Sequence, residues 1–137
     1  MKSMKDKVLL DSNIILYGFG REKTKKEIVK NLIRERPLLT TQVINEVLNV
    51  LIKKFNFSID EVKEVLNFLR TKTEIILVNL YTIDIALTVK ERYNFSYWDS
   101  LIIASALENG CRILYTEDMQ HGQVIEKTLT IKNPFFN

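Results

Sequence analysis

Short apolar runs alternate along this chain with longer stretches in which apolar residues recur every three to four positions. The apolar runs predict strands at residues 8–10, 37–40, 75–78 and 112–115, with a weaker one at 129–131. The longer stretches predict helices at about 12–17, 21–35, 41–55, 58–70, 81–92 and from 96 to just before Gly110. Strands separated by helices predict an α/β fold with a mostly parallel central sheet flanked by helices.

Several of these helices carry local start signals. Ser58 and Glu61 stand three apart and have the form of a capping box, and Thr40 or Thr41 is placed to cap the helix that follows. Residues 101–107 are apolar nearly all round, which predicts a central helix. In the helix over 81–92 the apolar positions include Ile83 and Leu87. The helix after Thr40 is expected to present one broad apolar face made of Val43, Ile44, Val47, Leu48, Leu51, Ile52 and Phe55.

Composition narrows the class of protein. The 137 residues predict a single domain over 1–137, and 46% hydrophobic with 27% charged residues is ordinary for a globular protein. No apolar run approaches the ~18 residues of a membrane span. The basic start, residues 1–7, lacks the apolar stretch of a signal peptide, so we expect a cytoplasmic protein without membrane contact. The one cysteine, Cys111, excludes an internal disulfide and is expected in the core.

Charge is unevenly distributed. The net charge is only +3, but residues 21–36 hold seven basic side chains against three acidic ones. Two interpretations stay open for this basic segment. It is either the solvated face of a helix, or a surface that contacts phosphates or an acidic partner.

Four carboxylates stand apart from the other acids because of their positions. Asp11 and Asp118 each follow an apolar strand, and parallel strands end at the same edge of a sheet, where α/β proteins bind ligands. Glu46 borders the apolar face of its helix, and Asp99 lies in the first turn of the apolar helix. We therefore ask whether these four acids share one site.

Each acid also has a purely structural explanation. Asp11 is placed to cap the helix that follows it, although Ser12 or Asn13 could cap it instead and leave the Asp11 carboxylate available for a metal. Glu46 suits the rim of an amphipathic helix, and Asp99 forms a capping-box pattern with Ser96. For Asp118 the alternative is a turn residue.

If the four acids converge, their repulsion must be relieved. Two close carboxylates repel by roughly 4 kcal/mol at an effective dielectric of ~20, so such a site protonates, distorts or binds a cation. Oxygen ligands without His or Cys favour Mg²⁺ or Mn²⁺. Such ions activate water for attack on a phosphodiester, and the hydroxyls of Ser12 and Thr116 are candidates to support water or ligand.

The chain resembles PIN domains, and among them the VapC-type toxin ribonucleases. Four motifs in order carry this resemblance, and together they extend over nearly the whole chain. They are Leu10-Asp11-Ser12-Asn13-Ile14-Ile15, Asn45-Glu46-Val47, Tyr97-Trp98-Asp99-Ser100-Leu101-Ile102-Ile103-Ala104-Ser105-Ala106, and Tyr115-Thr116-Glu117-Asp118-Met119-Gln120-His121-Gly122. Ser12 stands where such domains more often have Thr, and it keeps the hydroxyl.

The resemblance implies a PIN-like three-layer fold and a metal-dependent endoribonuclease. Asp11, Glu46, Asp99 and Asp118 would be its catalytic and metal-binding residues around one or two Mg²⁺ or Mn²⁺ ions, with Ser12, Asn13 and Thr116 in support. It also implies an RNA substrate, a cognate antitoxin that inhibits the toxin of a toxin–antitoxin pair, and a homodimer.

Other functions stay open. The chain could be an RNA-processing nuclease outside a toxin–antitoxin pair, a non-catalytic module that holds a basic peptide or an ion, or a phosphoacceptor domain with Asp11 as nucleophile. A Ser-His-Asp triad is disfavoured because His121 is the only histidine, expected in a surface turn. No glycine-rich nucleotide-binding loop is present. Trp98 is expected in the core, while Tyr97 is left open as a residue that could stack on a base.

Overall fold

The chain forms two compact units, and a boundary between them lies within the first strand. A computed structural model describes residues 6–136. β1 (Val8–Leu10) holds Leu9 and Leu10 in fully buried positions, as its apolar sequence predicts. One unit comprises Leu10–Leu77, and the other comprises the chain up to Leu9 together with the chain from Val78 onward.

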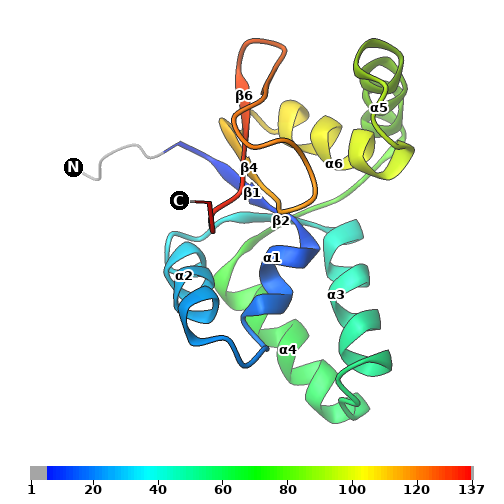
Figure 1. The fold of residues 1–137 in the computed structure, drawn as a ribbon. Coiled ribbons are helices and arrows are strands. Elements are labelled where there is room, and N and C mark those ends of the chain that lie inside the picture. Colours follow the sequence, from blue (N-terminus) through cyan, green and yellow to red (C-terminus); the bar gives the residue numbers. More distant parts are fainter. Residues whose placement is uncertain (1–5, 137) are drawn as a thin grey trace, which may run out of the picture. The chain divides into compact units, whose positions relative to one another are not determined.

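The unit Leu10–Leu77 is built from four helices and two short strands. Within it, α1 packs against α2 and α3, and α3 packs against α4 (Figure 1). The two strands are parallel, with Leu39 opposite Ile75. The elements are α1 (Ser12–Tyr17), α2 (Lys23–Arg34), β2 (Leu38–Thr40), α3 (Thr41–Lys53), α4 (Ile59–Lys72) and β3 (Glu74–Ile76).

Local start signals are confirmed in this unit. The Thr40 hydroxyl oxygen accepts a hydrogen bond from the Val43 N–H at 3.0 Å, which caps α3. Ser58 and Glu61 form the predicted capping box, in which each side chain accepts a hydrogen bond from the other residue's N–H, at 3.1 and 2.9 Å. These contacts join residues three apart, so the sequence alone is enough to predict them.

The predicted apolar face of α3 is only partly correct. Val43, Ile44, Val47 and Leu51 are buried. Ile52 is 40% exposed in the last turn of α3, and Phe55 is 37% exposed and lies beyond the helix end at Lys53. The inner face of this helix is therefore narrower than the hydrophobic pattern predicts.

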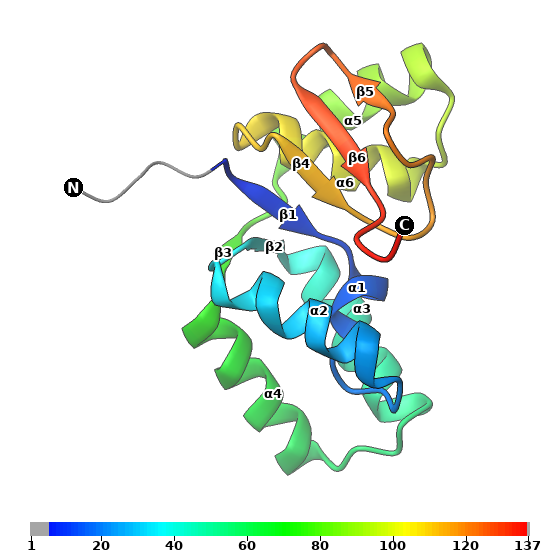
Figure 2. The same cartoon turned by 60° about the vertical axis from the view of Figure 1, so that its left-hand side comes forward.

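The second unit places two helices beside three further strands. α5 packs along α6, and α6 also contacts β4. β4 pairs with β6 in parallel, and β5 pairs with β6 in antiparallel as a hairpin (Figure 2). The Arg112 N–H donates a hydrogen bond to the Lys7 oxygen at 2.9 Å. The elements are α5 (Leu80–Tyr93), α6 (Tyr97–Glu108), β4 (Ile113–Tyr115), β5 (Val124–Ile125) and β6 (Leu129–Lys132).

α6 is the central helix that the sequence predicts. Every residue from Ser100 to Ala106 is buried, and the helix ends before Gly110, whose φ of +70° suits glycine. Of the two apolar positions named for α5, Ile83 packs against the cluster of Ala86, Leu101 and Ala104, whereas Leu87 is 54% exposed. Ala86 and Val89 are the buried apolar residues of this helix. Small residues on α5 allow close packing against α6.

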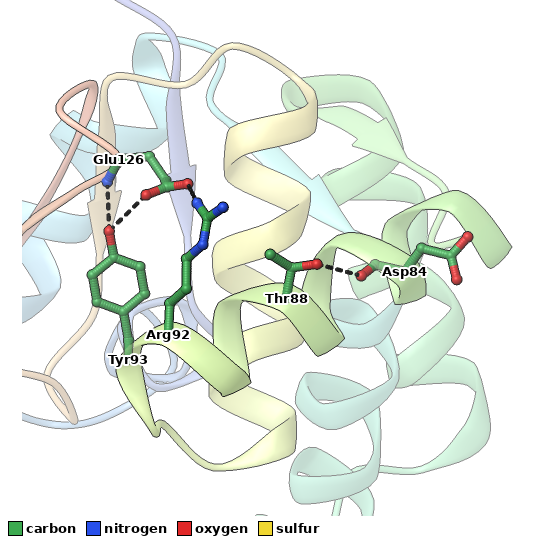
Figure 3. Close-up of polar contacts among 5 residues, drawn as sticks. All are labelled: Asp84, Thr88, Arg92, Tyr93 and Glu126. Atoms are coloured by element: carbon green, nitrogen blue, oxygen red, sulfur yellow. Dashed lines mark hydrogen bonds and ion pairs between the residues drawn. The ribbon is translucent and has the colours of Figure 1, made fainter.

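β6 is the weaker strand that the sequence predicts, but β5, which pairs with it in a hairpin, was not predicted. The turn of this hairpin places Glu126 at φ 49° and Lys127 at φ 63°, and the Ile125 oxygen accepts the Thr128 N–H at 3.2 Å. Two successive positive φ values usually need Asn or Gly, so Glu-Lys gives no hairpin signal. Contacts with the end of α5 hold this turn (Figure 3). The Tyr93 hydroxyl donates to Glu126 Oε2 at 2.8 Å and accepts the Glu126 N–H at 3.0 Å, and Arg92 forms an ion pair with Glu126.

The α/β class and the mostly parallel sheet are confirmed. The strands pair in the order β3-β2-β1-β4-β6-β5, with β5 antiparallel at one end. Cys111 is buried, as predicted. The single domain over 1–137 stays a prediction, and residues 1–5 of the basic start lie outside the described residues. Among residues 6–136, no helix is long and apolar enough to cross a membrane.

Candidate metal centre

Asp11 caps α1 with its carboxylate. Its backbone is extended, with φ −79° and ψ 162°, and Oδ1 accepts the Ser12 N–H at 2.7 Å. The prediction that Ser12 or Asn13 would do this capping is wrong, because Ser12 is already the first helical residue and Asn13 the second. Asp11 is buried, at 9% exposed, and each of the two oxygens of a carboxylate can accept more than one bond. Capping and metal binding by Asp11 are therefore compatible.

Glu46 lies on α3 in the same unit as Asp11. It is exposed, next to the buried Val47, which agrees with its predicted place at the border of the apolar face. α3 packs against α1, the helix that Asp11 begins. The two supporting candidates, Ser12 and Asn13, are half-buried in the first turn of α1.

Asp99 lies in the first turn of α6, half-buried. The Ser96 hydroxyl oxygen accepts the Asp99 N–H at 3.1 Å and caps the helix. Burial raises the pKa of the Asp99 carboxyl above its ordinary value of 3.8, a hydrogen bond with the Ser96 side chain opposes this, and the negative charge of Asp118 raises it further. Asp99 and Asp118 thus interact as like charges within one unit.

Asp118 follows β4 in a turn that Thr116 organises. The Thr116 hydroxyl oxygen accepts the Asp118 N–H at 3.2 Å, and the Thr116 N–H donates to the Lys132 oxygen at 3.0 Å. Thr116 is fully buried while Asp118 is exposed. The Thr-x-Asp spacing therefore has a direct structural role, since the threonine fixes the backbone from which the acid projects.

The donor chemistry of these residues fits a hard divalent cation. Two carboxylates close enough to raise a pKa are oxygen ligands of the kind that Mg²⁺ and Mn²⁺ prefer. Among the described residues, no group of three or more His, Cys, Asp or Glu side chains is gathered in a way that could hold a metal ion. Each unit holds two of the four candidate acids: Asp11 and Glu46 in one, Asp99 and Asp118 in the other.

The aromatic residues beside Asp99 correct one expectation. Trp98 is 63% exposed, so its predicted place in the core is wrong. It lies in the first turn of α6, before the enclosed stretch that begins at Ser100. Tyr97 is half-buried against the cluster of Ala86, Leu101 and Ala104. His121 is exposed, as expected; its Nδ1 accepts the Asn133 N–H at 3.0 Å and its ring stacks on Phe136.

The basic side chains of segment 21–36 are exposed around α2, except that of Lys25. Lys25 is partly buried, with its Nζ 4.3 Å from the centre of the Tyr17 ring and 4.0 Å from Glu22. Arg36 donates to the Thr71 oxygen at 2.9 Å. The exposure agrees with a solvated helix face, and a role in binding phosphates or an acidic partner stays an open prediction.

Comparison with known structures finds proteins that share the fold of this chain. The chain is similar to a toxin–antitoxin complex from Klebsiella pneumoniae, with 17% identity and a TM-score of 0.73 over 93% of this chain and 98% of that one. It is similar to DNA-bound VapBC from Salmonella typhimurium, with 16% identity and a TM-score of 0.68 over 95% and 99%. A third similar structure is VapC20 from Mycobacterium tuberculosis, a sarcin-ricin loop cleaving toxin, with 15% identity and a TM-score of 0.64 over 81% and 89%.

Comparison of sequences gives the family itself. No curated protein matches the chain significantly. The model of the PIN domain family matches residues 8–126, a range that contains all four candidate acids and parts of both units. The predicted resemblance is thereby confirmed, and the chain belongs to the PIN domain family.

Proposed function

We propose that this protein is a metal-dependent endoribonuclease that hydrolyses RNA phosphodiester bonds. The observation that carries the proposal is the pair of carboxylates Asp99 and Asp118 in a PIN domain, where burial raises the pKa of Asp99 and the negative charge of Asp118 adds to this rise. A divalent cation relieves such repulsion, and nucleases with PIN domains generally use divalent metal ions. Mg²⁺ and Mn²⁺ are the ions that suit carboxylate ligands best.

We propose that four acids bind the metal and that three further residues support them. Asp11, Glu46, Asp99 and Asp118 are the proposed ligands and catalytic residues, with Ser12, Asn13 and Thr116 in support. When bound, the ion neutralises charge on the phosphate and activates water. Asp99 must release its proton before it binds the ion, so its raised pKa makes binding weaker in acid. Thr116 holds the Asp118 backbone, and Ser96 holds that of Asp99.

We also propose that the enzyme is the toxin of a toxin–antitoxin pair and a homodimer. The support is the fold, which resembles a toxin–antitoxin complex, DNA-bound VapBC and a sarcin-ricin loop cleaving VapC toxin. An antitoxin would inhibit the enzyme by placing a basic side chain among its carboxylates. Co-expression with the neighbouring gene tests this partner: a stable complex that lacks cleavage activity is expected.

Cleavage by matched variants tests the catalytic proposal. The purified chain, free of any partner, is incubated with RNA and Mg²⁺ or Mn²⁺, and compared with Asp11→Asn and Asp99→Asn. We expect loss of cleavage in both variants and in the presence of a chelator. Asp84→Asn is the matched control, because Asp84 is an exposed acid on α5 outside the proposed set (Figure 3). Equal cleavage by the parent and all three variants contradicts the proposal.

Two other functions make different predictions in the same assay. An RNA-processing nuclease outside a toxin–antitoxin pair cleaves RNA but has no inhibitor encoded beside it. A non-catalytic module binds a basic peptide and cleaves no RNA with any divalent ion. The acid pair favours the enzyme, since neutralisation by a metal ion suits two repelling carboxylates.

A further inference from the structure

Trp98 presents a large aromatic surface to solvent directly beside a proposed catalytic acid. Its side chain is 63% exposed, although tryptophan is highly buried on average. It precedes Asp99 in the first turn of α6. The indole contacts the Tyr97 ring, and most of its surface is open to a ligand.

The indole is held on a rigid support. Ser96 caps the first turn of α6, and the Tyr97 ring contacts the Trp98 ring edge-to-face, with centroids 5.4 Å apart and planes at 72°. Tyr97 is itself packed against the buried cluster of Ala86, Leu101 and Ala104. An exposed ring on a fixed helix loses little entropy when a flat ligand stacks on it.

We propose that Trp98 stacks on a nucleobase of single-stranded RNA next to the scissile phosphate. This inference rests on the proposed function, because the adjacent Asp99 defines where the phosphate would lie. Adjacent residues have Cα atoms about 3.8 Å apart, and their side chains diverge by about 100° on a helix. Stacking tolerates any base, so Trp98 would add affinity more than sequence preference.

Fluorescence gives a direct test, because Trp98 is the only tryptophan in the chain. The Asp11→Asn chain in Mg²⁺ is titrated with a short single-stranded oligoribonucleotide while tryptophan emission is followed. We expect saturable quenching by the oligonucleotide and none by an abasic strand of the same length. Binding detected by the anisotropy of labelled RNA without any change in tryptophan emission overturns the inference.

Cleavage kinetics give the second arm. Trp98→Leu keeps an apolar side chain but removes the aromatic face, and we expect KM to rise by about 5- to 150-fold with kcat nearly unchanged. Trp98→Phe should recover part of the loss. Tyr81→Leu is the matched control, since Tyr81 is 65% exposed and its neighbour Thr82 bonds to Glu108, at the opposite end of α6 from Asp99. Parent-like KM in Trp98→Leu overturns the inference.

The two arms separate this inference from the proposed function. If the parent cleaves RNA and Trp98→Leu has the same KM as the parent, the inference of base stacking is wrong while the proposed nuclease function is retained. If the parent cleaves no RNA, the nuclease is wrong, and the titration still decides whether Trp98 stacks on bases. If tryptophan emission shifts with protein concentration and never with RNA, a second copy of the chain covers Trp98, which also overturns the inference.

Discussion

Asp11 combines a structural role with a proposed catalytic one, and two substitutions separate them. Its Oδ1 accepts the Ser12 N–H at 2.7 Å at the start of α1. Asp11→Asn keeps an oxygen in this position, whereas Asp11→Ala removes it. Removal of a cap typically costs about 1 kcal/mol, which corresponds to a fall of about 3–5 °C in the midpoint of thermal unfolding for a chain of this size. We therefore expect Asp11→Asn to be as stable as the parent and Asp11→Ala to be less stable.

Thermal unfolding in a chelator, followed by circular dichroism, measures these differences without a contribution from metal binding. Ser12→Ala is the matched control, because Ser12 is the first helical residue and its side chain does not cap α1. We expect it to unfold within a few tenths of a kcal/mol of the parent. Cleavage should be lost in both Asp11 variants whatever their stability.

Three results would refute this reasoning. If Asp11→Ala is as stable as the parent, the hydrogen bond to the Ser12 N–H does not support α1. If Asp11→Asn is as unstable as Asp11→Ala, the charge of the carboxylate matters rather than its acceptor oxygen. If Asp11→Asn cleaves RNA at the parental rate, the proposed catalytic role of Asp11 is wrong.

Two further predictions concern α6. The pKa of Asp99 in the folded chain lies above its ordinary value of 3.8, so folding favours the protonated carboxyl. The stability that this contributes is present in acid and is lost as the pH rises through the folded pKa. Unfolding in urea without divalent ions should therefore show Asp99→Asn close to the parent in acid and more stable than the parent at neutral pH. Among the described residues, the buried Ser100 Oγ has no hydrogen-bond partner, whereas Ser105 Oγ donates to the Leu101 oxygen at 3.0 Å. Ser100→Ala should therefore stabilise the chain by about 1 kcal/mol and Ser105→Ala should destabilise it by a similar amount. The first prediction is contradicted if Asp99→Asn is less stable than the parent at neutral pH. The second is contradicted if both serine variants lose the same amount of stability.

Much of the fold could be predicted because its signals are local. The capping box of Ser58 and Glu61, the Thr40 cap and the stop at Gly110 each depend on residues a few positions apart. The Thr116-x-Asp118 turn belongs to the same class, since the hydroxyl and the N–H it binds are two residues apart. Sequence order alone was also enough to single out the four acids.

Side-chain exposure was harder to predict, since it depends on neighbours from other elements. Leu87 and Trp98 are apolar, yet both are largely exposed, while Ala86 faces inward from α5. A hydrophobic residue gives no sign in the sequence of whether another element covers it. The cap of α1 stayed open between Asp11 and Ser12 or Asn13 for a related reason: it depends on which residue has the extended backbone, and Asp, Ser and Asn are all good caps.

The sequence by itself determined the α/β class, the family motifs and the candidate acids, because hydrophobic period and residue order are properties of the chain alone. Only the tertiary structure decided that Asp118 raises the pKa of Asp99, since they are 19 positions apart in the sequence. The same is true of the β5–β6 hairpin, whose Glu126 turn is held by Tyr93 and Arg92 from the end of α5. Such contacts join residues far apart in the chain, and only folding brings them within hydrogen-bonding or electrostatic range.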